Sequence, residues 1–215
     1  GSYEPPPATE PPRSAMKRHV AILIFPDVEV LDFAGPFEVF AVTNELNGSE
    51  VFHTFTVAEN PGSIRARHGL KIVPDHTLET CPAPHLLIVP GGAGTRPLLR
   101  KPAVLEWIRQ RARQAEHVAS VCTGSLVLAQ AGLLNNLRAT THYTRFAELA
   151  ALAPNTDIDE SCRFTDNGQV LTAAGISAGI DLSLHLVARL LGEAAAEKSA
   201  RHMEYHWRND GGVTR

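Results

Sequence analysis

Apolar and polar residues alternate along the chain in blocks that predict strands and helices in turn. The segments "HVAILIF" (19–25) and "HLLIVP" (85–90) are continuous apolar runs, which are typical of strands buried on both faces of a sheet. Further strands are expected at 52–59, 70–75, 117–121, 138–143, 162–167 and 169–175.

Helical patterns fill most of the intervals between these strands. Residues 33–46 predict a helix with Pro36 in its first turn, a position that proline tolerates. Another helix is expected over 98–114, with a break near Pro102. Helices are also expected at 124–134, 177–191 and 193–207.

The alternation of strand and helix predicts an α/β fold of the flavodoxin-like, doubly wound type. Its sheet is expected to be mostly parallel with helices on both faces, and its active site to lie at the carboxyl ends of the strands. We expect one domain over residues 17–207, preceded by a proline-rich extended tail at 1–16 and followed by a short tail at 208–215.

Composition and charge narrow the functional class. The 215 residues are 44% apolar and carry a net charge of −3, so neither nucleic-acid binding nor membrane binding is expected from charge. No apolar run reaches the roughly 18 residues of a membrane helix, and no secretory signal is recognisable. The three cysteines, Cys81, Cys122 and Cys162, are odd in number and irregularly spaced, which favours a reducing compartment, the cytoplasm.

Cys122 stands at the corner between a predicted strand and a predicted helix, in "HVASVCTGSLVLAQAGLL" (117–134). A tight strand-to-helix turn of this kind, a nucleophile elbow, presents its side chain to a substrate. Thr123 and the small residues after it let backbone amides approach closely, and the helix N-terminus favours a thiolate. A buried structural cysteine is the alternative, and the local pattern alone leaves both open.

Several segments resemble the DJ-1/PfpI superfamily, which is related to class I glutamine amidotransferases. They are "ASVCTGSLVLAQAGLL", "RATTHY" and "TAAGISAGIDLSLHLVARL", and the resemblance covers nearly the whole chain after the tail. Together, "VCTGS", "LDFAGP" and "PGGAG" resemble the isocyanide hydratases and the amidotransferase-like sensor domains of AraC-type regulators.

The resemblance implies a role for each candidate site residue. Cys122 is the nucleophile, and Asp32 hydrogen-bonds it and manages protons, although the residues alone favour a helix N-cap for Asp32. The amides of Gly91 and Gly92 face developing negative charge, with a tight turn as the alternative. His142 is a possible supporting base, and a structural role is favoured for it.

Two classes of function follow from the resemblance. The first is a hydratase that converts an isocyanide and water into an N-substituted formamide through a Cys122 thioimidate, with Asp32 as acid and base and no metal or organic cofactor. The second is a stand-alone ligand-sensing or redox-sensing domain related to AraC-type regulators. The chain ends at Arg215, without room for a DNA-binding domain, and this favours the enzyme.

Glyoxalase-like aldehyde chemistry remains a third possibility, which the Cys122–Asp32 pair disfavours. Thr123 stands where proteases of the superfamily carry histidine, and this disfavours a protease. A homodimer and a small-molecule substrate are expected from the resemblance, and no metal site is expected.

Overall fold

The computed structural model describes residues 16–207, so the expectations for most of both tails lie outside the described residues. Its centre is a seven-stranded sheet in the order β10-β11-β7-β6-β1-β2-β5. The strands are β1 (Arg18–Leu23), β2 (Phe52–Ala58), β5 (His76–Thr77), β6 (Leu86–Val89), β7 (His117–Ser120), β10 (Phe164–Asp166) and β11 (Val170–Ala173). All neighbours pair in parallel except β10 and β11.

Five of these strands, β2-β1-β6-β7-β11, follow the 2-1-3-4-5 order of flavodoxin-like sheets, which confirms the predicted fold class. Strands β6, β7 and β11 are buried at every position. A strand covered on both faces is built mostly from apolar residues, because neither side meets water.

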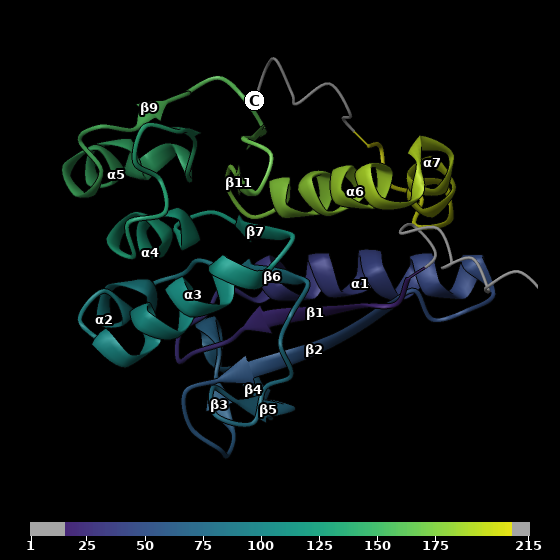
Figure 1. Ribbon diagram of the computed structural model, residues 1–215, viewed down its shortest axis with the longest axis horizontal. Coiled ribbons are helices and arrows are strands. Elements are labelled where there is room, and N and C mark those ends of the chain that lie inside the picture. The colour runs from purple at the N-terminus through teal and green to yellow at the C-terminus, as the bar shows by residue number, and fades with distance from the viewer. Residues whose placement is uncertain (1–15, 208–215) are drawn as a thin grey trace, which may run out of the picture.

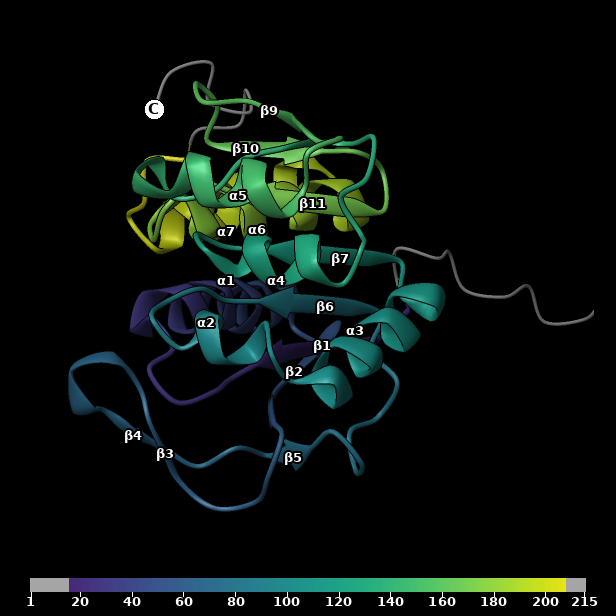
Figure 2. The ribbon, with the colours of Figure 1, turned by 90° about the vertical axis from the view of Figure 1, so that its left-hand side faces the viewer.

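Helices cover the sheet on both faces (Figures 1 and 2). On one face α1 packs against α6 and α7, and on the other α3 packs against α4. The helices are α1 (Val30–Asn47), α2 (Thr95–Leu98), α3 (Pro102–Gln114), α4 (Gly124–Gln130), α5 (Phe146–Leu152), α6 (Ala178–Leu191) and α7 (Glu193–His202). No helix within residues 16–207 is long and apolar enough to cross a membrane.

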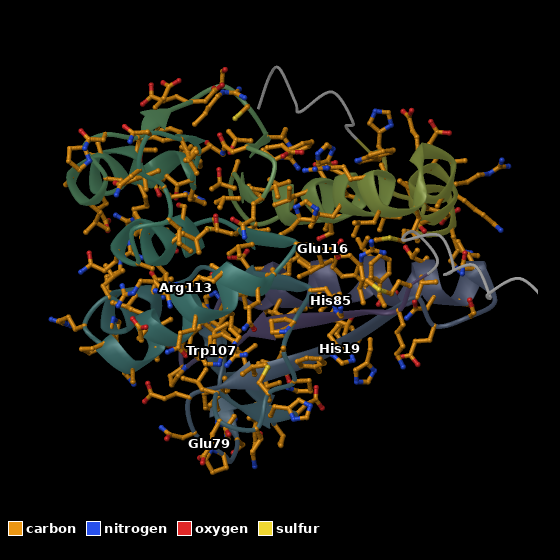
Figure 3. All side chains as sticks on the ribbon, viewed as in Figure 1. His19, Glu79, His85, Trp107, Arg113 and Glu116 are labelled. Atoms are coloured by element: carbon orange, nitrogen blue, oxygen red, sulfur yellow. The ribbon has the colours of Figure 1, made fainter. Side chains whose placement is uncertain are left out.

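A side chain of the amphipathic helix α3 connects this helix to the segment after β5. Trp107 is buried, and its indole N–H donates to the carbonyl of Leu78 at 3.1 Å, which fastens the segment after β5 to the helix (Figure 3). At the amino ends of β1 and β6, His19 and His85 lie beside each other with ring centroids 5.6 Å apart (Figure 3). These histidines therefore lie at the amino ends of the strands, opposite to the carboxyl ends where an active site is expected.

Several predicted boundaries were wrong. The first helix begins at Val30 rather than 33, so Pro36 lies inside it rather than in its first turn. The predicted helix over 98–114 is divided into α2 and α3, and the second begins at Pro102, the predicted point of interruption. The helices predicted to reach 134 and 207 end at Gln130 and His202.

Short elements replace two of the predicted strands. The predicted strand at 70–75 is reduced to β4 (Lys71–Ile72), which pairs with β3 (Ile64–Arg65) in a separate hairpin around the 3-10 turn η2 (Arg67–Gly69). The strand expected at 138–143 is reduced to β8 (Arg138–Ala139), paired with β9 (Asp157–Ile158). The 3-10 turn η3 (Tyr143–Arg145) and α5 were not predicted.

Candidate active site

Cys122 occupies the turn between β7 and α4, as the elbow interpretation requires. Its φ is 56°, in the left-handed region that non-glycine residues rarely adopt. The Cys122 amide donates to the carbonyl of Ala174 at 2.9 Å, and its carbonyl accepts from the hydroxyls of Thr141 at 3.0 Å and Ser125 at 3.2 Å. These hydrogen bonds from three segments hold the strained turn in place.

Two glycines allow the chain to pack closely around this turn. A Cβ on Gly124 would lie 2.0 Å from the carbonyl oxygen of Val89. A Cβ on Gly91 would lie 2.5 Å from the amide nitrogen of Thr123 and 3.0 Å from Cβ of Cys122. Real Cβ atoms do not approach backbone so closely, so both positions require glycine for the elbow to pack against the end of β6.

Asp32 lies beside the thiol, in the first turn of α1. It is fully buried, and its Oδ2 accepts the amide hydrogen of Gly91 at 2.9 Å. Glu29, not Asp32, occupies the N-cap position, so the N-cap interpretation of Asp32 was wrong. The Asp32 carboxyl points to the loop after β6, where it accepts the Gly91 amide hydrogen, and not to the amides of its own helix.

Burial raises the pKa of the Asp32 carboxyl from its ordinary value of 3.8 to about 7. The hydrogen bond from the Gly91 amide opposes this rise in pKa, the nearby charge of Glu29 adds to it, and the Cys122 side chain lowers it. A carboxyl with a pKa near neutrality both gives and takes a proton readily, which is what a general acid–base needs.

The thiol of Cys122 shows the opposite of the effect expected from a helix N-terminus. Burial, and then the adjacent charge of Asp32, raise its pKa from 9.0 to about 12, so the resting group is a thiol. The amides of Ile176 and Thr123 hydrogen-bond the sulfur and lower its pKa, but they do not outweigh desolvation. Since the two side chains shift each other's pKa, Cys122 and Asp32 titrate as a coupled pair.

The remaining candidates surround this pair. The Gly92 amide donates to Oγ1 of Thr123 at 2.9 Å, as the Gly91 amide donates to Asp32. Both glycine amides are thus engaged by protein acceptors, and the oxyanion role implied for them stays a prediction. His142 accepts the Thr144 amide hydrogen at Nδ1 at 3.2 Å and caps η3, which gives it a structural role.

A cavity of about 550 Å³ opens above the thiol. Its lining brings together Cys122, Thr123, Gly92 and His142, four of the predicted site residues. It also contains residues that sequence analysis missed, most of them charged. These are Glu29, Arg67, Ala93, Arg96, Thr144, Arg145, Glu148 and Ile176.

Of the missed residues, Ile176 has a recognisable signal in the sequence. It follows β11, a buried strand, in the segment "AAGISAG", and strand ends on this edge of the sheet form the site. Its φ of 36° turns the chain so that its amide faces the sulfur of Cys122. The arginines and glutamates have no comparable signal, because they come from turns and short helices without a periodic pattern.

The candidate site thus combines a strand-to-helix cysteine, a buried carboxyl from the first helix and a glycine loop after the third strand of a flavodoxin-like sheet. Residues 18–189 match the DJ-1/PfpI family, and the chain belongs to that family.

Known relatives within the family differ in function. The chain is 37% identical to the isonitrile hydratase of Pseudomonas putida over 190 residues, which cover 88% of this chain and 79% of that protein. It is 30% identical to the HTH-type transcriptional regulator CdhR of Pseudomonas aeruginosa, over 84% of this chain and 53% of the regulator. The chain therefore spans about half the length of that regulator.

Solved structures agree with the fold. A THiJ/PfpI family protein from Pseudomonas syringae superposes with a TM-score of 0.80 at 30% identity, covering 94% of this chain and 84% of that one. DJ-1beta of Drosophila melanogaster superposes with a TM-score of 0.79 at 17% identity, covering 89% of this chain and 100% of that one, and supports the fold alone.

Proposed function

We propose that the protein is an isocyanide hydratase, which adds water to a small isocyanide, R–N≡C, to give the formamide R–NH–CHO. One observation carries the proposal: the fully buried Asp32 carboxyl, with a pKa raised to about 7, lies beside the Cys122 thiol, and Cys122 lines the cavity. The isonitrile hydratase of Pseudomonas putida, isonitrile being a synonym of isocyanide, supports the substrate class.

The first step joins sulfur and a proton to the terminal carbon of the isocyanide. Because the pKa of the Cys122 thiol is about 12, a free thiolate is scarce at neutral pH. The ionised Asp32 accepts the thiol proton as sulfur attacks the carbon, and then delivers that proton to the same carbon. One C–S bond and one C–H bond form, leaving a thioimidate, Cys122–S–CH=N–R, and an ionised Asp32.

The second step uses the regenerated carboxylate as a base. Asp32 takes a proton from water as the water oxygen bonds to the thioimidate carbon, and passes this proton to the nitrogen. The C–S bond then breaks as the carbonyl forms, and the hydroxyl proton returns through Asp32 to sulfur. The sum is R–N≡C plus water giving R–NH–CHO, with the thiol and the carboxylate restored.

The backbone around the thiol lowers the energy of both steps. The amides of Ile176 and Thr123 point at the sulfur and stabilise it whenever it carries negative charge, on attack and on departure. The Gly91 amide holds Asp32 in position by its 2.9 Å hydrogen bond. Since these donors belong to a turn that is already fixed, they need no reorganisation during the reaction.

The test of this function is formamide production from cyclohexyl isocyanide, separated and quantified by chromatography. Wild-type protein is expected to form N-cyclohexylformamide, and Cys122→Ala to form less than about 1% of that amount, because its nucleophile is gone. Cys162→Ser is the matched control, since Cys162 is also a buried thiol but does not line the cavity. Wild-type protein without formamide production would overturn the proposal.

A second candidate function is supported by the regulators. The transcriptional regulators GbdR and CdhR of Pseudomonas aeruginosa share 28% and 30% identity with this chain. A sensing domain would bind a ligand in the same cavity without turnover. Binding of cyclohexyl isocyanide without any formamide, measured by calorimetry and chromatography on one sample, would favour sensing over the hydratase.

A further inference from the structure

The cavity above Cys122 has an unusual charge pattern for a site that takes an apolar isocyanide. Three arginines line it, from three different elements: Arg67 in η2, Arg96 in α2 and Arg145 in η3. Two carboxylates, Glu29 and Glu148, line it as well. Positive side chains therefore outnumber negative ones in the lining of the cavity.

Two of the arginines share a single carboxylate as their ion-pair partner. Glu148 Oε1 lies 3.0 Å from Arg96 Nη2 and 3.3 Å from Arg145 Nη1. One negative charge shared by two guanidinium groups leaves this side of the mouth with a positive excess. Arg96 is further fixed by a 3.2 Å hydrogen bond from Nη1 to Thr95 Oγ1.

Arg67 is different, because its guanidinium has no ion-pair partner among residues 16–207. Its backbone is nevertheless held firmly at the site. The Arg67 amide donates to the carbonyl of Val28 at 2.9 Å, and the Asp27 amide donates to the carbonyl of Arg65 at 2.9 Å. The η2 turn is thereby fastened to the loop that leads into α1 and Asp32, with the neighbouring Ala66 buried.

We propose that the substrate carries a carboxylate on its R group and that Arg67 binds this carboxylate. The inference rests on the proposed hydratase function and names the substrate class of the same site. An unpaired guanidinium fits a carboxylate bidentately, and the positive excess at Arg96 and Arg145 draws the anion toward the mouth.

Glu29 sets the orientation of such a substrate. Its amide donates to the carbonyl of Gly91 at 2.9 Å and its side chain is half-buried, whereas Arg67 is exposed, so Glu29 lies toward the thiol end of the cavity. There it repels a carboxylate, whereas Arg67 attracts one at the mouth. The carboxylate consequently faces outward and the neutral isocyanide carbon faces the sulfur.

The first arm of the test compares isocyanoacetate with its methyl ester, a pair that differs mainly in charge. In wild-type protein kcat/KM is expected to be about tenfold higher for the anion, through KM, because the contact is equally strong before and during the reaction. Arg67→Gln should remove this preference, and Arg67→Lys should keep part of it. Lys71→Gln is the control, with the same charge change on the same hairpin but outside the cavity.

The second arm does not depend on hydratase activity. Iodoacetate and iodoacetamide alkylate a cysteine by the same displacement of iodide but differ in charge, and peptide mass spectrometry reports the rate at Cys122 alone. The rate ratio of iodoacetate to iodoacetamide is expected to fall about tenfold in Arg67→Gln and to stay unchanged in Lys71→Gln.

The two arms separate the possible failures. If neither isocyanide is turned over but the alkylation ratio falls in Arg67→Gln, the hydratase function is wrong and the anion site stands. If the ester is hydrated as well as the anion and the alkylation ratio is the same in wild-type protein and Arg67→Gln, the carboxylate proposal is overturned and the hydratase remains.

Discussion

Asp32→Asn is expected to make the protein more resistant to alkaline conditions while disabling its chemistry. The substitution keeps the shape of the side chain and an oxygen to accept the Gly91 amide hydrogen, but it removes the ionisable group. Since the carboxyl is fully buried, its ionisation in the folded state is opposed by desolvation.

The sign and size of the effect follow from the two pKa values. The folded pKa of about 7 lies above the ordinary value of 3.8, so the stabilising contribution of the protonated carboxyl is complete below pH 3.8 and is lost as pH rises through 7. Between about pH 5 and pH 8 the ionisation of Asp32 should lower the unfolding free energy of the wild-type protein by roughly 2 to 3 kcal/mol. Asp32→Asn has no such group to lose.

Urea denaturation at pH 5 and pH 8 measures this difference directly. The unfolding free energy of Asp32→Asn minus that of wild-type protein should rise by roughly 2 to 3 kcal/mol between the two pH values. The subtraction cancels the titration of the groups that do not interact with Asp32. An unchanged difference would show that Asp32 does not hold a raised pKa, and would contradict its proposed role as general acid and base.

Three further expectations concern packing, assembly and the tail. Gly91→Ala should destabilise the fold by about 1 to 3 kcal/mol and reduce turnover in the formamide assay, because its Cβ would lie 2.5 Å from the Thr123 amide nitrogen. Gly48→Ala is strained by a φ of 70°, but its Cβ would meet no atom within 4 Å, and it should leave turnover unchanged. We expect a homodimer, since α1 exposes 40% of Leu31 and 42% of Phe37, and sedimentation equilibrium giving a monomer at micromolar concentration would contradict this. Removal of residues 1–15, outside the described part, should leave the melting temperature and the activity unchanged, and a fall of several degrees would refute that.

The parts of the fold that sequence analysis predicted are those where burial controls residue choice. The apolar runs at 19–25, 85–90 and 117–121 became β1, β6 and β7, because most positions of a strand with two covered faces are apolar. The helix α5 escaped notice because only Leu149 of its seven residues is buried, which leaves almost no periodic pattern to read.

The candidate site likewise has a part that could be predicted from the sequence and a part that could not. The cysteine elbow was predictable, since small residues after a buried strand indicate a tight turn. The raised pKa of the thiol was not, because it depends on desolvation by segments distant in sequence and on Asp32, 90 positions away. Tertiary folding alone brings Arg67, Arg96 and Arg145 to the same cavity, and no spacing along the chain predicts this.

The central claim is that Cys122 carries the substrate covalently while Asp32 moves the protons. Rapid acid quench of wild-type protein during turnover of cyclohexyl isocyanide, followed by peptide mass spectrometry, tests it most directly. We predict an adduct on the Cys122 peptide equal in mass to one isocyanide in wild-type protein, and in Asp32→Asn neither this adduct nor more than about a hundredth of the formamide rate. Wild-type turnover without any adduct on Cys122, or formamide production by Asp32→Asn at the wild-type rate, would contradict the proposed roles.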